Sequence, residues 1–291
     1  MGIPGGPLTS SRSSRAAAGL LGGFSRAVRP QTVLSLPALL AILFLSLPLL
    51  AVVVKVPWGS FAEILGRRDT VEALVLSLTT ASIATLICLL LGIPLAWSLD
   101  HLGRSRHALP YRLVRALVLI PLVLPPVVGG VALLMLLGRR GVLGGPVYDL
   151  TGFSIPFTTA AVVIAQSFVA LPFLVLAVEG ALRSIDRDID EVALDLGATP
   201  TEAFLLVVLP IVRPAVISGA VLCFARALGE FGATITFAGN LPGVTRTMPV
   251  ATYITMQSDP DAALTLSLIL LVVALAILVA LRDRWTRGIF R

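Results

Sequence analysis

The sequence has few charged side chains. Only 13% of its 291 residues are Asp, Glu, Lys or Arg, whereas soluble domains carry about 25%, and 57% are hydrophobic. This balance excludes an ordinary soluble domain. Five uncharged stretches each have the roughly 20 helical residues that cross a hydrocarbon core, and a sixth candidate is interrupted by Arg226 and Glu230. We therefore predict an all-α integral membrane protein with six transmembrane helices. The predicted spans are about 33–54, 73–99, 116–138, 157–179, 211–238 and 262–281.

The residue types that build most catalytic and metal sites are also scarce. Cys88 and Cys223 fall within predicted spans, at a spacing typical of neither a disulfide nor a metal site. His101 and His107 lie in a predicted loop, and no span contains a Ser-His set or a carboxylate dyad. These absences argue against a membrane-embedded enzyme, so we predict no catalytic and no metal-binding residue. The nucleotide-binding pattern G-x-x-x-x-G-K-[ST] is missing too, so we expect no cofactor in this chain.

Most Lys and Arg residues lie in the segments that an inside N-terminus would place in the cytoplasm. The positive-inside rule therefore predicts a multi-pass protein of a bacterial-type inner membrane, with both termini cytoplasmic. Attraction of these residues to the anionic leaflet of the lipid bilayer explains the net charge of +6, and we expect no nucleic acid partner.

The N-terminal 1–30 segment is rich in Gly, Ser, Pro and Arg, which predicts a flexible cytoplasmic tail before one transmembrane domain over 31–291. Arginines before the first span also fit a cleaved signal peptide. However, the apolar run is longer than the usual signal core of about 7–15 residues, which favours a retained helix.

A cluster of helix breakers interrupts the third predicted span. It contains Pro121, Pro125, Pro126, Gly129 and Gly130 within ten positions. Kinked packing explains isolated prolines in membrane helices, whereas this density also fits a broken helix beside a cavity.

The segment 186–210, between the fourth and fifth spans, predicts a helical hairpin. Gly197 follows the first helix, where a left-handed C-terminal cap favours glycine. Thr199, Pro200 and Glu202 then supply an N-cap, a first-turn proline and the glutamate of a capping box, so a second helix begins there. The first helix is amphipathic, because apolar residues recur at i, i+3, i+4 and i+7. These residues are Ile189, Val192, Ala193 and Leu196.

The hairpin is acidic: between Asp186 and Glu202 the only basic residue is Arg187. Amphipathic helices that rest on a membrane usually carry Lys and Arg on the polar face. The sign of the charge therefore favours docking to a protein partner.

The fifth predicted span contains charged residues. Arg226 and Glu230 are one helical turn apart, and Thr234 continues the same face. A charge within a span is a functional hypothesis by default, and here the face would line a translocation pathway for an anion. The structural alternative is a self-neutralising pair that fixes helix packing.

A spaced pattern runs through the hairpin: Glu191, Ala193 and Gly197 are followed, after nine residues, by the run from Val207 to Pro210. It resembles the EAA loop of bacterial ABC-importer permeases, E-A-A-x3-G-x9-I-x-L-P, with Val192 and Val207 as mild departures. In that family the loop is the coupling helix, which sits in a cleft of the ATPase subunit. The resemblance implies a coupling role for Asp190, Glu191, Ala193, Gly197, Ala198, Thr199 and Pro200.

The run from Arg226 to Pro249 resembles the molybdate branch of these permeases, and its Gly-Glu-Phe-Gly core is similar in sulfate permeases. The resemblance implies ATP-driven import of molybdate or tungstate by alternating access. It also implies a second copy of this chain, two ABC ATPase subunits that bind ATP and Mg, and an extracytoplasmic oxyanion-binding protein. A sulfate permease and an ion-coupled secondary anion transporter are the alternatives.

Overall fold

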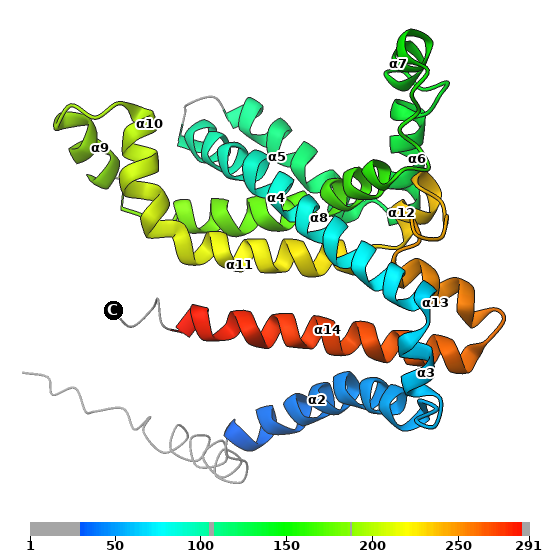
Figure 1. Cartoon of the computed structure of the whole chain (residues 1–291). Coiled ribbons are helices and arrows are strands. Elements are labelled where there is room, and N and C mark those ends of the chain that lie inside the picture. Colours follow the sequence, from blue (N-terminus) through cyan, green and yellow to red (C-terminus); the bar gives the residue numbers. More distant parts are fainter. Residues whose placement is uncertain (1–29, 105–107, 187, 287–291) are drawn as a thin grey trace, which may run out of the picture. The chain divides into compact units, whose positions relative to one another are not determined.

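The computed structural model describes residues 30–104, 108–186 and 188–286, and every regular element in this part is a helix (Figure 1). Contacts divide the chain into two units, with the boundary between Lys55 and Val56. The predicted tail lies, as far as residue 29, outside the described residues. The helices are α2 (Pro30–Lys55), α3 (Phe61–Gly66), α4 (Arg68–Arg104), α5 (Ala108–Val123), α6 (Pro126–Leu137), α7 (Gly144–Thr151), α8 (Thr159–Leu182), α9 (Asp188–Asp195), α10 (Pro200–Ala203), the π-helix η1 (Phe204–Val208), α11 (Leu209–Leu228), α12 (Gly232–Phe237), α13 (Met248–Met256) and α14 (Pro260–Thr286).

Helix α2 is the described part of the first unit. From residue 35 onwards its side chains are almost all exposed, and apolar residues lie on every side of it. A helix that is apolar all round is typical of a membrane span. Lys55, its last residue, provides a long basic side chain suited to the polar boundary of a bilayer.

Three long helices, α4, α8 and α11, form the core of the second unit and lie side by side in Figure 1. Small residues allow their backbones to approach closely. A Cβ atom added at Gly92 of α4 would lie 2.9 Å from Leu174 of α8, and one added at Gly219 of α11 would lie 3.0 Å from the same side chain. The predicted span 73–99 falls within α4, and the predicted span 157–179 falls within α8 except for its first two residues.

The predicted span 116–138 is divided between α5 and α6. The two helices bend by 116° at the break before Pro126. Pro125 has an extended ψ of 132° and, like Pro126, has no N–H to continue a helix. Beyond the break, α6 packs on α12 so closely that a Cβ at Gly130 would lie 2.8 Å from the carbonyl oxygen of Ala233. The density of prolines and glycines therefore marks a broken helix.

The predicted span 211–238 also differs from the structure. The long helical segment begins at Pro200, runs through η1 and α11, and ends at Leu228. Gly229 and Glu230 interrupt it, and the short helix α12 follows. The two glycines that flank Glu230 and Phe231 explain the break, because glycine weakens helix interiors and favours helix ends.

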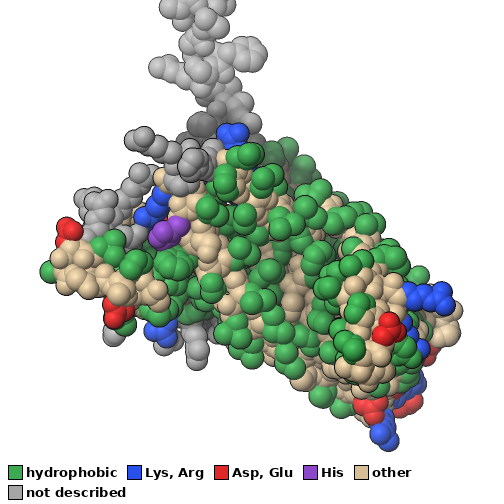
Figure 2. All heavy atoms as spheres, turned by 90° about the horizontal axis from the view of Figure 1, so that it is seen from above, with side chains coloured by type: hydrophobic (Ala, Val, Ile, Leu, Met, Phe, Trp, Pro, Cys, Tyr) green, Lys and Arg blue, Asp and Glu red, His purple; other side chains and the backbone are tan. Residues whose placement is uncertain are grey.

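Helices α13 and α14 complete the second unit, and α13 also packs on α4. The Ser77 hydroxyl of α4 accepts a hydrogen bond of 2.7 Å from the Met248 backbone N–H at the start of α13. Figure 2 shows that hydrophobic side chains cover much of the visible face, whereas charged side chains gather towards its ends.

Five helices are long and apolar enough to cross a membrane, and the bent pair α5 and α6 makes a sixth if it is counted as one span. The all-α membrane fold predicted from the composition is confirmed.

Candidate docking hairpin and translocation site

Two helix caps shape the hairpin between α8 and α11. Gly197 adopts a φ of +90°, in the left-handed region. Its N–H donates to the carbonyl of Leu194, and the N–H of Ala198 donates to that of Ala193, which together form a Schellman motif. Thr199 and Glu202 then form the predicted capping box, with Pro200 in the first turn of α10. The two helices predicted from local signals are therefore present, joined by a tightly hydrogen-bonded turn.

The hairpin exposes much of its apolar face. Ala193 is buried, whereas Val192 is 56% exposed and Leu196 is 84% exposed. Apolar side chains of α9, Leu196 and η1 line a groove of about 420 Å³, together with Asp186. Solvent-exposed apolar surface on a projecting element is typical of a protein interaction site. Asp190 and Glu191 belong to α9, but their side chains lie outside the described residues.

An aromatic contact joins the hairpin to the core. Phe204, the first residue of η1, stacks on Trp97 of α4 with ring centroids 5.0 Å apart. Trp97 also contacts His101 edge-on at 4.8 Å. The π-helix η1 lies in a continuous helical run between α10 and α11, a position where such bulges often mark functional sites. Phe204 thus connects the end of α10 to α4 through Trp97, and η1 connects it to α11 through the backbone.

Arg226 and Glu230 form the predicted ion pair, with Arg226 Nη1 2.6 Å from a Glu230 carboxylate oxygen. Glu230 is nearly fully buried, and its other oxygen accepts a 2.8 Å hydrogen bond from the Ala233 backbone N–H. The carboxylate therefore holds together the end of α11 and the start of α12. Thr234 is separated from Arg226 by the helix break, so these residues do not continue one helical face.

Two fully buried polar side chains near this break have no hydrogen-bond partner among the described residues. They are Thr234 on α12 and Gln166 on α8. Residues beside Gln166 belong to two apolar clusters: Val163 packs with α4 and α11, and Val162 packs with α12. Gln166 therefore lies on a part of α8 that is packed between these two clusters. Gln166 was not predicted as a site residue, although an uncharged polar residue within a long apolar run is visible in the sequence.

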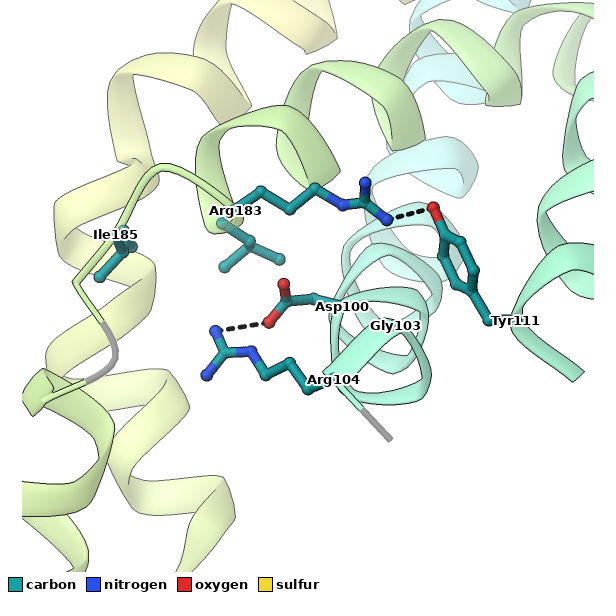
Figure 3. A pocket seen from close by; sticks show the side chains of 7 residues that line it. Asp100, Gly103, Arg104, Tyr111, Arg183 and Ile185 are labelled. Carbon is teal, nitrogen blue, oxygen red and sulfur yellow. Dashed lines mark hydrogen bonds and ion pairs between the residues drawn. The ribbon is translucent and has the colours of Figure 1, made fainter. Parts of the chain in front are cut away.

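A charged cluster that was not predicted from the sequence lies at the end of the bundle that carries the hairpin. Glu179 of α8 is 2% exposed and lies 2.9 Å from Arg183 Nη2 and 3.6 Å from Arg115 Nε. The Tyr111 hydroxyl donates to Glu179 at 3.0 Å. Asp100 and Arg104 of α4 form a separate pair at 2.6 Å, and both line a cavity that Tyr111 and Arg183 also line (Figure 3). Both i,i+4 pairs were visible in the sequence, because each has a carboxylate four residues before an arginine at the end of an apolar run.

Across the described residues, no group of three or more His, Cys, Asp or Glu side chains is arranged to hold a metal ion. The described residues instead provide buried ion pairs and, on the hairpin, an exposed apolar surface. A bundle of spanning helices with buried charges and a projecting apolar hairpin defines an integral membrane protein of the transporter class.

The chain belongs to the family of binding-protein-dependent transport system inner membrane components, whose model matches residues 88–288. Solved ABC transporters share the fold. One is a bacterial transporter involved in the import of the acidic polysaccharide alginate, which has 17% identity and a TM-score of 0.68 over 88% of this chain and 95% of that chain. Another is the inward-facing MetNI methionine transporter, with 20% identity and a TM-score of 0.58 over 76% and 96%.

Curated relatives are more similar in sequence. The molybdenum transport system permease protein ModB of Mycobacterium bovis is 49% identical over 253 residues, which cover 87% of this chain and 94% of the relative. ModB of Escherichia coli K12 is 39% identical over 220 residues, or 76% of this chain and 94% of the relative. The predicted resemblance to permeases of this family is confirmed.

Proposed function

We propose that the chain is the permease subunit of an ATP-driven importer that moves molybdate, or the similar anion tungstate, into the cytoplasm. The observation that carries the proposal is the 49% identity to a molybdenum permease across 87% of the chain. The identity extends well beyond the hairpin, so it includes the helices that would form the pathway. This chain hydrolyses no ATP in the proposal, because ATP and Mg are bound by the partner ATPases.

The hairpin is the proposed ATPase docking element. Its two caps give it a defined shape, and Leu196 offers apolar surface that a partner would bury. Two ATPases would bind two copies of this chain. Closure of the ATPases would then shift α10, and the contact between Trp97 and Phe204 would transmit the shift to the core. In the proposed orientation of the chain in the membrane, the hairpin and both termini lie in the cytoplasm, where the ATPases are. The oxyanion-binding protein would bind on the opposite side.

Arg226 and Glu230 are the proposed control point of the pathway. The side chain of Arg226 is 26% exposed, whereas that of Glu230, which neutralises it, is buried. A partly exposed cation attracts an oxyanion, and a neighbouring carboxylate keeps binding weak enough for release. Because Glu230 also accepts a hydrogen bond from the first turn of α12, an anion that competes for Arg226 would loosen the junction between α11 and α12.

The proposal is tested by the ATPase activity of the assembled complex, reconstituted in proteoliposomes with its oxyanion-binding protein. We expect the binding protein loaded with molybdate to stimulate hydrolysis, and Leu196→Glu to abolish that stimulation by placing charge in the docking groove. Leu109→Glu changes another exposed leucine, on α5, and serves as a control for nonspecific effects of surface charge. Equal stimulation by a sulfate-loaded binding protein would instead favour the sulfate permease, whose Gly-Glu-Phe-Gly core is similar.

A further inference from the structure

A polar cavity of about 360 Å³ lies between the ends of α4, α5 and α8, on the side of the hairpin. Figure 3 shows the guanidinium groups of Arg104 and Arg183 entering it from two different helices, with the Asp100 carboxylate between them. The Tyr111 ring stands beside Arg183. The cavity is lined by Asp100, Gly103, Arg104, Tyr111, Leu182, Arg183 and Ile185.

The two arginines are held in fixed positions. Arg183 Nη2 contacts both the Glu179 carboxylate, at 2.9 Å, and the Tyr111 hydroxyl. Its guanidinium also lies 5.0 Å from the centre of the Tyr111 ring. Arg104 is held by Asp100 at 2.6 Å. Both carboxylates are almost fully buried, so they act as rigid anchors for side chains that would otherwise lose conformational freedom on binding a ligand.

One carboxylate in the cluster serves two arginines, because Glu179 is shared between Arg115 and Arg183. Within the described part of the chain, Arg183 uses only Nη2 for hydrogen bonds and ion pairs, so Nε and Nη1 retain their donors. A guanidinium presents these donors as a planar fork that matches two oxygens of a tetrahedral oxyanion.

We propose that this cavity binds a tetrahedral oxyanion group, with Arg183 and Arg104 as its donors and Tyr111 as the side chain that orients Arg183. A free oxyanion and the phosphodiester of a phospholipid headgroup share this chemistry, and the cavity lies at the ends of spanning helices, where both are present. Asp100 opposes the anion directly and therefore keeps the affinity moderate. The inference does not depend on which cargo the transporter carries.

Direct binding to the purified full-length chain in neutral detergent tests the site. Titration calorimetry with sodium molybdate and inorganic phosphate measures the free-anion arm, and native mass spectrometry with phosphatidylglycerol measures the lipid arm. We expect saturable binding in at least one arm. Loss of one charge-assisted contact in Arg183→Gln or Arg104→Gln should weaken it about 10- to 100-fold.

Two further variants separate a binding site from a folding defect. Asp100→Asn removes the opposing charge and should strengthen oxyanion binding several-fold, an effect that misfolding does not produce. Arg112→Gln is the matched control, because Arg112 is exposed on α5 one residue from Tyr111 and does not line the cavity. The proposal is overturned if neither arm saturates, if Arg112→Gln weakens binding as much as Arg183→Gln, or if Asp100→Asn weakens it.

Discussion

The turn of the hairpin depends on a backbone conformation that only glycine adopts without strain, so Gly197→Ala gives a sharp prediction. At a φ of +90° a Cβ atom added to Gly197 meets no heavy atom within 4 Å, so the substitution introduces backbone strain and no side-chain clash. The left-handed conformation costs an L-residue about 1–2 kcal/mol relative to glycine. That difference raises the population of the opened turn about 5- to 30-fold.

Hydrogen exchange measures this population directly. The Ala198 N–H donates to Ala193 only while the Schellman motif is closed, so its exchange rate should rise by the same factor in Gly197→Ala. Gly197→Asn should show a smaller increase, because asparagine visits the left-handed region more readily. An increase below about twofold in the alanine variant would refute the assignment of strain to this residue.

Gly180→Ala is the matched control. Gly180 lies inside α8, has no left-handed φ, and also has open space around its Cβ position. Alanine is favoured over glycine in a helix interior by up to about 1 kcal/mol, so this variant should leave Ala198 exchange unchanged and stabilise α8 slightly. The change from glycine to alanine should therefore destabilise the turn at position 197 and stabilise α8 at position 180. For the complex, only Gly197→Ala should reduce ATPase-coupled transport.

Three other predictions rest on single groups. Thr199→Ala removes the N-cap of α10 and should destabilise that helix by about 1 kcal/mol, seen as faster exchange of the Glu202 N–H; unchanged exchange would contradict the cap. Gln166→Leu replaces a buried amide without a partner and should raise the free energy of unfolding by about 1–3 kcal/mol, measured by thermal unfolding in detergent, whereas a lower melting temperature would mean that the amide is hydrogen-bonded. Arg226→Ala should impair oxyanion uptake while the ATPases still assemble, and uptake with unchanged kinetics would favour a packing role for the ion pair.

The features that could be predicted from the sequence depend on contacts between near neighbours. Gly197 and Thr199 indicate the hairpin because a cap is a hydrogen bond across three to five residues. The prolines before and within α6 mark the break in the third span for the same reason. Composition alone predicts a membrane fold, because a bilayer requires long uncharged helices.

The features that could not be predicted depend on tertiary contacts. Glu179 lies in the last turn of α8 and Arg183 directly follows that helix, but Tyr111 and Arg115 come from α5. The cavity beside them exists only when α4, α5 and α8 converge. Likewise, Glu230 looks like part of a continuous helical face. Its role at the start of α12 appears only once the helix is known to end at Leu228.

Transport of labelled substrate tests the central claim most directly. Proteoliposomes that contain the chain, its ATPase and its binding protein should take up radiolabelled molybdate only with ATP. Excess tungstate should suppress the uptake strongly, and excess sulfate only weakly. Uptake that sulfate suppresses as well as tungstate does, or uptake driven by an ion gradient without ATP, would contradict the assignment of this chain as the permease of an ATP-driven molybdate importer.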